Sequence, residues 1–297
     1  MSKYSIRDIE ELSGIKAHTL RIWEQRYNIV QPLRTDTNIR YYTDEQLKLI
    51  LNISLLNKNG LRISQIAKME DNERDQAIAL IDNKDLQFEN QIKSLTFSMI
   101  DMREDQFEKI VNTSILQLGF ETTMISIIYP FLERVGTLWR SGAISPAQEH
   151  FISNLIRQKI IVAIDGQMAV NHSSSNKFVL CTPEGDLHEL SLLFMHYLLR
   201  SRGINSIYLG ATVPYKDLLN VVETHKPDYL FMVFMVKPNR TTVSAYLQQL
   251  AKDFTKQQIL VSGAKVLSKP ELVPDEIRLI KSFDDSVAFV ESISNSV

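Results

Sequence analysis

The sequence predicts a multidomain chain with an all-α N-terminal part, a middle four-helix bundle, and a C-terminal α/β part built on a doubly wound parallel sheet. Three observations support this division. Short helical patterns joined by turn signals fill residues 1–72. Longer stretches of helical periodicity with short connections, typical of a bundle, follow over residues 80–168. Over residues 176–297, short apolar runs alternate with helical stretches, which predicts β-α-β units.

Capping and turn signals predict the elements of the first part. Ser5 can cap a first helix that Gly14 ends, and Ser64 can cap a short fourth helix. The other expected features are a helix over 17–25, a turn-rich stretch over 31–38, a helix from Asp44, and a charged linker over 71–75.

Periodicity predicts the elements of the other two parts. The bundle helices are expected at 86–100, 104–118, 122–140 and 145–164. Pro130 should kink the third of them. The Ser-rich segment 171–176 predicts a second linker. Strands are expected at 178–182, 204–210, 229–236, 259–262 and 277–283, and helices at 187–202, 215–225, 241–254 and 284–293.

The composition is that of a globular protein, with 44% hydrophobic and 23% charged residues. Cys181 is the single cysteine, which excludes an internal disulfide and a cysteine-rich metal cluster. The N-terminus lacks the apolar region of a signal peptide. The longest apolar runs are far shorter than the roughly 20 residues that span a bilayer. We therefore expect a cytoplasmic protein with no membrane partner.

A local basic patch stands out in the first part. Between Lys16 and Tyr42 there are five basic residues and two acidic ones, whereas the whole chain has a net charge of −2. Phosphate binding requires such a patch, although a solvated basic face is the alternative interpretation. A helix-turn-helix presents the N-terminal residues of its second helix to base edges, and a basic wing contacts phosphates. The candidate DNA-binding residues are Ser5, Lys16, His18, Thr19, Arg21, Arg34, Arg40 and Tyr41.

The first part resembles the MerR family of transcription regulators. The residues that carry the resemblance are 4–9 (YSIRDI), 13–15 (SGI), 19–27 (TLRIWEQRY), Pro32, 39–47 (IRYYTDEQL) and 59–67 (NGLRISQIA). The resemblance implies a winged helix-turn-helix that binds a double-stranded DNA operator. The RIWEQRY variant, followed by a bundle, is similar to the subgroup of CarH-type light-responsive regulators.

Two constellations lie downstream. Trp139 is followed, after nine residues, by Glu149 and His150; a core aromatic and a solvated pair are the alternatives. Asp186 and His188 follow the first expected strand of the sheet, at the edge where doubly wound sheets bind ligands. Asp186 could accept a hydrogen bond from one ring nitrogen of His188 and leave the other as a metal donor, although a simple surface histidine is the alternative.

Taken together, these constellations resemble the cobalamin-binding module of methionine synthase and its relatives, a helical cap followed by a flavodoxin-like (Rossmann-like) domain. The resemblance implies that His188 is the lower axial cobalt ligand and that Asp186 orients it. It also implies that Trp139, Glu149 and His150 surround the upper face of adenosylcobalamin. The family's residues along the nucleotide tail fall on Ser191 and Val233, in place of a glycine and a serine, and on Gly263, the one glycine left of a pair.

The sequence thus predicts a DNA-binding transcription regulator, a repressor in the first instance, that senses cobalamin and light through its oligomeric state. A homodimer or homotetramer is expected, and a protein antagonist is a further candidate partner. The alternative is a cofactor-free regulator whose degenerate module serves dimerisation or partner binding. An enzyme is not expected, because no further domain remains to hold a substrate.

Overall fold

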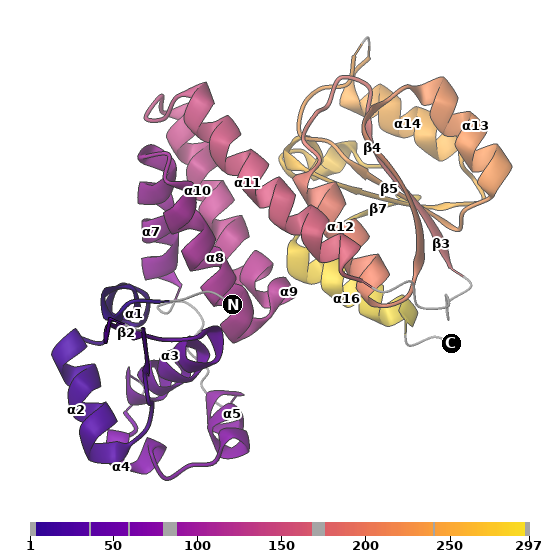
Figure 1. Cartoon of the computed structure of the whole chain (residues 1–297). Coiled ribbons are helices and arrows are strands. Elements are labelled where there is room, and N and C mark those ends of the chain that lie inside the picture. Colours follow the sequence, from indigo (N-terminus) through magenta and orange to yellow (C-terminus); the bar gives the residue numbers. More distant parts are fainter. Residues whose placement is uncertain are drawn as a thin grey trace. The chain divides into compact units, whose positions relative to one another are not determined.

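The computed structural model describes residues 4–35, 37–58, 60–79, 88–167, 176–239 and 241–294 (Figure 1). The chain forms two compact units, Met1–Ile152 and Ser153–Val297. Each unit is described by itself.

The first unit begins with two short helices and a hairpin. α1 (Ile6–Ser13) starts at Ser5 in a capping box with Asp8, and Gly14 ends it in the left-handed conformation, as expected. α2 (Ala17–Tyr27) runs two residues beyond its expected end, to a left-handed cap at Asn28. The turn-rich stretch forms the predicted wing, in which β1 (Leu33–Arg34) pairs antiparallel with β2 (Arg40–Tyr41).

Among the described residues, three further helices follow in this part: α3 (Asp44–Lys58), α4 (Ile63–Ile66) and α5 (Asp71–Ala79). Two expectations were wrong here. Ser64 lies inside α4, whose N-cap is Arg62. Residues 71–75 are the start of α5 rather than a linker. Leu20 and Trp23 of α2 pack into one core with Tyr42, Leu47 and neighbouring residues, so α2 is anchored by its apolar face.

The helical middle part contains α7 (Glu89–Ile100), α8 (Glu104–Leu118) and α11 (Pro146–Asp165), close to their expected bounds. Between α8 and α11, the helical path runs through α9 (Phe120–Thr123), a π-helical segment (Met124–Ile128) and α10 (Tyr129–Arg140). The irregularity expected at Pro130 therefore takes the form of a π segment just before it. Because proline has no N–H to donate, the wider turn accommodates the missing hydrogen bond.

The second unit contains a parallel sheet of five strands in the order β4-β3-β5-β6-β7. The strands are β3 (Lys177–Pro183), β4 (Asn205–Val213), β5 (Tyr229–Val233), β6 (Gln258–Ser262) and β7 (Ile277–Leu279). The helices are α12 (Leu190–Ser201), α13 (Tyr215–His225), α14 (Val243–Asp253), the short α15 (Ala264–Leu267) and α16 (Phe283–Ser294), with a 3₁₀ turn at Pro270–Leu272. This confirms the doubly wound α/β prediction.

The switch point of the sheet lies between β3 and β5, because β3 has β4 on one side and β5 on the other. Helices cover both faces (Figure 1). The core against α13 and α14 contains Val179, Met232 and Val261 from three central strands. The second expected linker falls almost entirely on 168–175, outside the described residues. No helix within the described ranges is long and apolar enough to cross a membrane.

Candidate functional site

The start of α2 is organised by a carboxylate from α1. Glu10 accepts a hydrogen bond from the Ala17 backbone N–H at 3.0 Å and one from Lys16 Nζ at 2.9 Å. The Lys16 hydrogen bond and the Ala17 N–H lower the pKa of the Glu10 carboxyl. Glu10 therefore does the capping that Lys16, at the N-cap position, does not do with its own side chain. Sequence reasoning missed this role of Glu10.

Most of the candidate base-reading side chains reach solvent. Lys16, His18 and Arg21 are exposed and Thr19 is half-buried, with His18 Nε2 and Thr19 Oγ1 3.3 Å apart. Ile22, on the same helix, is 49% exposed although it is apolar. The sequence does not indicate that Ile22 is exposed, because it is an apolar residue within an expected helix and directly follows Arg21.

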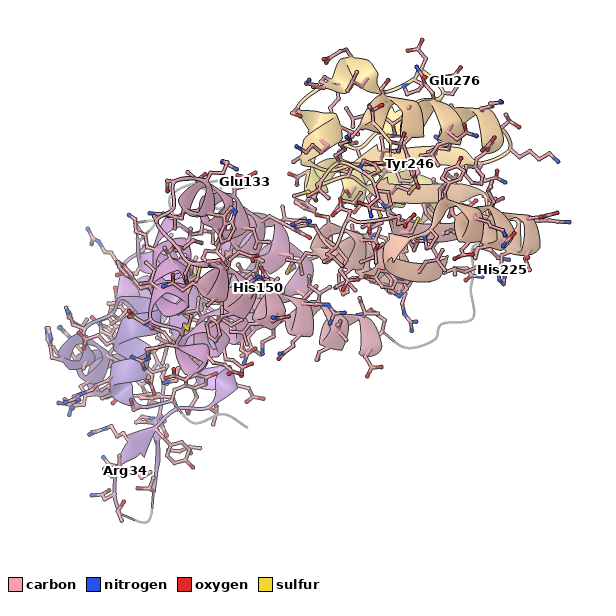
Figure 2. All side chains as sticks on the ribbon, turned by 90° about the horizontal axis from the view of Figure 1, so that it is seen from above. Arg34, Glu133, His150, His225, Tyr246 and Glu276 are labelled. Carbon is pink, nitrogen blue, oxygen red and sulfur yellow. The ribbon has the colours of Figure 1, made fainter. Side chains whose placement is uncertain are left out.

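The wing carries the candidate phosphate contacts. Arg34, on β1, donates to the backbone and side-chain oxygens of Asn38 at 3.2 and 2.7 Å (Figure 2). Arg40 lies 3.8 Å from the Glu24 carboxylate, and Tyr42 Oη donates to the same group at 2.5 Å. Arg40 thus also holds the wing against α2. Replacing Arg40 would therefore disturb the position of the wing as well as any phosphate contact, so Arg34 is the better residue for testing phosphate contact. Tyr41 is half-buried.

Ser5, the remaining candidate, has a clear structural role. Its Oγ accepts from Asp8 N at 3.3 Å, and its backbone N–H donates to Asp8 Oδ2 at 2.9 Å. The other Asp8 oxygen lies 2.7 Å from Lys109 Nζ on α8. Burial raises the pKa of Asp8, but the hydrogen bonds from Lys109 and Ser5 outweigh it and the net pKa is lowered. Through Asp8, at the start of α1, the N-terminal part is attached to the helical middle part.

The upper-face candidates all lie in the first unit. Trp139, at the end of α10, is 44% exposed, so it is not the core aromatic that was one alternative. Glu149 is half-buried and His150 is exposed, both in the first two turns of α11 (Figure 2). An indole with this much exposed surface is available to pack on a flat ligand.

In the second unit, Asp186 and His188 form a tight pair after β3. The Asp186 side chain is fully buried, and its Oδ1 lies 2.9 Å from His188 Nδ1. The same Oδ1 accepts the His188 backbone N–H at 3.1 Å. Its Oδ2 accepts the N–H groups of Met235 and Val236, just beyond β5, at 2.7 and 3.0 Å. One carboxylate therefore joins the two strand ends on either side of the switch point.

These contacts set the charge of the pair. Burial raises the pKa of Asp186, but the hydrogen bonds from His188 and from the backbone N–H groups of Val236, His188 and Met235 make the net pKa lower than usual. An ionised Asp186 favours the tautomer of His188 that carries its proton on Nδ1, and Nε2 then bears the lone pair. The His188 side chain is 58% exposed, so its imidazole can reach a ligand.

A second polar network, which sequence reasoning missed, adjoins His188. The Glu189 carboxylate accepts from Arg157 Nε on α11 at 2.7 Å and from Tyr208 Oη on β4 at 2.6 Å. It thereby fixes the residue after His188 to both α11 and the sheet. Because Arg157 and Glu189 are 32 residues apart in sequence, no spacing signal connects them.

The candidate tail-binding positions differ in what they offer. Ser191 is half-buried on α12, and Val233 is fully buried at the end of β5. Gly263 has φ +105°, and a Cβ there would lie 2.5 Å from the Phe234 carbonyl oxygen. The glycine is thus needed for the close approach of two backbones whether or not a ligand binds. Within the described residues, no three side chains of His, Cys, Asp or Glu gather as a metal site.

Two stretches of the chain match models of known protein families. Residues 4–73 match the family model for MerR HTH family regulatory proteins, and residues 91–163 match the B12 binding domain model. The chain is 27% identical over 233 residues to the HTH-type transcriptional repressor CarH of Myxococcus xanthus, covering 76% of this chain and 77% of the relative. It is 26% identical over 235 residues to the repressor CarA of the same organism, covering 77% and 76%.

A solved structure shares the fold. The Methanosarcina barkeri monomethylamine corrinoid protein superposes with a TM-score of 0.55 at 13% identity, over 69% of this chain and 97% of that protein. At this identity the likeness concerns the fold alone. It agrees with the expected helical cap followed by an α/β domain.

Proposed function

We propose that this chain, a MerR-type regulator of the CarH kind with a cobalamin-binding-type module, binds a DNA operator and represses transcription in response to cobalamin. The observation that carries the proposal is the pair formed by buried Asp186 and exposed His188 in a chain that begins with a helix-turn-helix. We place this activity in the cytoplasm, on chromosomal DNA.

The DNA-binding half of the proposal is supported by the surface of α2 and the wing. Lys16, His18 and Arg21 are exposed on a helix held from behind by Leu20 and Trp23. Such a helix can enter the major groove with its polar face while the wing lies along phosphates. We assign base reading to Lys16, His18, Thr19 and Arg21, and phosphate contacts to Arg34, Arg40 and Tyr41.

The cofactor half is supported by the donor chemistry of His188. A neutral imidazole oriented through Nδ1 by a buried carboxylate is a good nitrogen donor to a transition metal. Asp186 is already fully hydrogen-bonded, so it can hold the ring at one angle without any change on ligand binding. His188, oriented by Asp186, would therefore fit as the residue that holds the cobalt of a bound cobalamin.

The tail-binding positions fit less well. Ser191 and Val233 each replace a smaller or more polar group of the family pattern, and Val233 is already packed in the core. Each added side chain in a close-packed channel costs about 1–3 kcal/mol through overpacking. Retention of cobalamin should consequently depend strongly on the His188–cobalt bond.

Trp139, Glu149 and His150 are the candidates for the upper side of the cofactor. We propose that Trp139 selects for the adenosyl group and that Glu149 and His150 line its pocket. When bound, adenosylcobalamin would supply a cobalt–carbon bond that light can break. Trp139, Glu149 and His150 would couple the presence of this group to the state of assembly. A homodimer or homotetramer gives the avidity that a single winged helix lacks.

The test is a visible-absorbance titration with adenosylcobalamin, followed by gel filtration in the dark and after illumination. We expect the wild type to retain the cofactor and His188→Ala to lose it. His225→Ala, at an exposed position near the end of α13, is the matched control and should bind as the wild type does. Trp139→Ala should weaken the preference for adenosylcobalamin over hydroxocobalamin more than it weakens corrin binding.

The second candidate function is also transcription regulation, but without a cofactor. If neither the wild type nor His188→Ala retains cobalamin at micromolar concentration, the chain is a cofactor-free regulator. Its α/β unit would then serve dimerisation or the binding of a protein antagonist. The substitutions at Ser191 and Val233 are the observations that favour this alternative.

A further inference from the structure

The end of β4 contains a residue in a strained conformation. Thr212 has a φ of +56°, in the left-handed region. Among the described residues, the other non-glycine residues at positive φ are two asparagines, a methionine and a lysine, so Thr212 is the β-branched member of this group. A β-branched residue in this region is strained, and such strain persists only where neighbouring contacts hold it. Strained residues concentrate at binding sites, so the contacts of Thr212 indicate the role of this position.

A β-bulge gives Thr212 its conformation. Cys181 of β3 pairs with Gly210 of β4. Pro183, two residues later, pairs with Val213, which is three residues later. β4 therefore carries one residue more than β3 between these pairs, and such bulges are common beside active sites, where they redirect a side chain. In a regular strand the N–H lies in the plane of the sheet and the side chain stands perpendicular to it. At Thr212 both polar groups instead face the segment that follows β3.

The two polar groups of Thr212 hold the segment that leads to His188. The Thr212 Oγ1 accepts the Gly185 N–H at 2.9 Å. The Thr212 N–H donates to Thr182 Oγ1 at 2.8 Å and lies 3.2 Å from the Asp186 carbonyl oxygen, which it also reaches. The fully buried Thr182 donates its hydroxyl to that same carbonyl oxygen at 2.6 Å. The backbone of Asp186 is thereby held from the ends of β3 and β4, whereas its carboxylate is held by the loop after β5.

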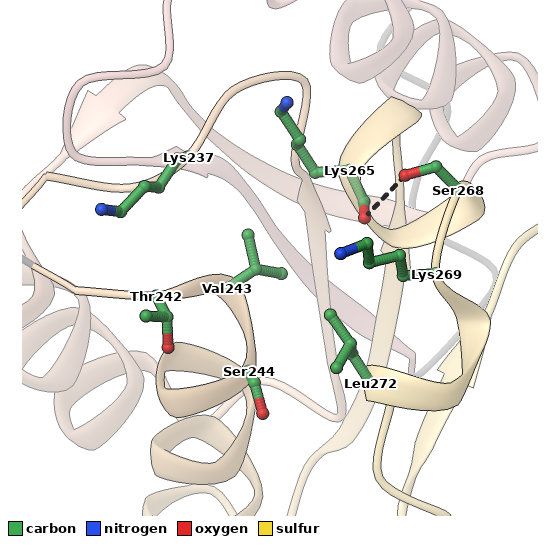
Figure 3. A pocket seen from close by; sticks show the side chains of 8 residues that line it. All are labelled: Lys237, Thr242, Val243, Ser244, Lys265, Ser268, Lys269 and Leu272. Atoms are coloured by element: carbon green, nitrogen blue, oxygen red, sulfur yellow. Dashed lines mark hydrogen bonds between the residues drawn. The ribbon is translucent and has the colours of Figure 1, made fainter.

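The loop after β5 holds this segment as well. In that loop, Lys237 and Thr242 line a hollow at the edge of the sheet (Figure 3), and Asn239 lies between them in sequence. The Asn239 N–H donates to the Glu184 carbonyl oxygen at 3.1 Å. Gly185 has φ +90°, and a Cβ there would lie 2.5 Å from Asn239 Oδ1. The segment between β3 and His188 is thus fixed from two neighbouring strand ends before any ligand binds, which lowers the conformational cost of binding.

We propose that Thr212 is a positioning residue for His188. This inference rests on the cobalamin-binding function proposed above. Thr212 fixes the backbone of Asp186 at the edge of the sheet, and the Asp186 carboxylate then holds the His188 imidazole at one angle. A residue that only stabilised the end of β4 would act differently. Its replacement would lower the free energy of unfolding and leave the His188 ring unchanged.

The first experiment uses the full chain without cobalamin and two variants at Thr212, an exposed position. Thr212→Val keeps the β-branched shape and removes the hydroxyl, whereas Thr212→Ser keeps the hydroxyl. We expect Thr212→Val to shift or broaden the imidazole ¹⁵N resonances of His188 at a fixed neutral pH, with His188→Ala serving to assign them. It should also lower the exchange protection of the Gly185 amide by about tenfold, because that N–H loses its acceptor. Thr212→Ser should match the wild type in both measurements.

The second experiment is the absorbance titration with adenosylcobalamin. Thr212→Val should bind about tenfold more weakly, and Thr212→Ser should bind as the wild type does. Thr212→Gly removes the hydroxyl but also relieves the backbone strain. Its urea midpoint should therefore lie at or above that of Thr212→Val, while its affinity for cobalamin should be no higher. Thr255→Val is the matched control, because Thr255 is an exposed threonine just before β6, at the opposite edge of the sheet.

Three results would overturn the inference. One is a Thr212→Val chain whose His188 resonances and Gly185 amide are those of the wild type. Another is a Thr212→Ser chain that fails to restore them. The third is a Thr212→Gly chain that binds cobalamin as tightly as the wild type. If the wild type itself retains no cobalamin, the proposed function is wrong, and the measurements on the cobalamin-free chain still decide whether Thr212 positions His188.

Discussion

Replacing Asp186 by alanine should release the His188 loop from the end of β5. The change removes the acceptor of three backbone N–H groups, those of His188, Met235 and Val236, as well as the partner of the His188 ring. Each buried donor left without a partner costs about 1–3 kcal/mol. Water entering the space would satisfy some of them, so we expect a local loss of about 3–5 kcal/mol.

Amide hydrogen exchange is the appropriate assay, because both tryptophans of the chain, Trp23 and Trp139, lie outside this unit. A loss of about 3 kcal/mol corresponds to roughly a 100-fold fall in protection, since 1.4 kcal/mol is about tenfold. This fall should appear at the amides of Met235 and Val236. Asp275→Ala, at an exposed carboxylate of the same unit, is the control. Protection in Asp186→Ala equal to that in the control would refute the reasoning.

The same pair predicts a dependence on pH. The pKa of Asp186 is lowered in the folded chain, so the stabilisation is fully present above the unfolded pKa of about 3.9. It is lost as the pH falls through the lower folded value. Protection at Met235 and Val236 should therefore hold at neutral pH and decline only under acid conditions.

Three further predictions concern other parts of the chain. Gly263→Ala should lower the free energy of unfolding by about 2 kcal/mol or more, because its Cβ would meet the Phe234 backbone at a positive φ; an unchanged urea midpoint would contradict this. Lys109→Ala should destabilise the first unit by up to about 1 kcal/mol, and a double-mutant cycle with Asp8→Ala should recover a coupling of that size, whereas additive losses would exclude the contact. Arg34→Ala should weaken binding to all DNA sequences alike and flatten the salt dependence; a slope equal to that of the wild type would remove Arg34 from the phosphate contacts.

Much of the fold follows from local sequence signals. The capping residues at Ser5 and Gly14 place α1, and the alternation of apolar runs and helical stretches predicts the α/β unit with all its strands in order. These signals work because each depends on residues that are close in sequence. The Asp186–His188 pair was predictable for the same reason, since the two residues are separated by one position.

Other features depend on contacts that sequence alone does not reveal. The apolar run after Tyr229 predicts a strand to 236, but β5 ends at Val233, because Asp186 takes the N–H groups of Met235 and Val236. The same carboxylate takes the His188 N–H, and α12 begins only at Leu190.

The charged segment after residue 70 is a second example. Its low apolar content indicates a linker, yet it is helical. The Arg74 guanidinium donates to the carbonyl groups of Ile66 and Met69 and to the Asp71 carboxylate. The helix is thus stabilised by polar contacts with the preceding turn, for which hydrophobic periodicity gives no signal.

The π-helical segment Met124–Ile128 determines which way the end of its helix faces. A π turn accommodates about one residue more than an α turn, and one residue corresponds to about 100° of rotation about the helix axis. Rewinding this segment as α-helix, with no residue deleted, would turn all that follows, Trp139 included, by about that angle. The direction of the exposed Trp139 indole therefore depends on a π-helical segment that ends eleven residues before it. Its direction is set by how this segment is wound as much as by the chemistry of its residues.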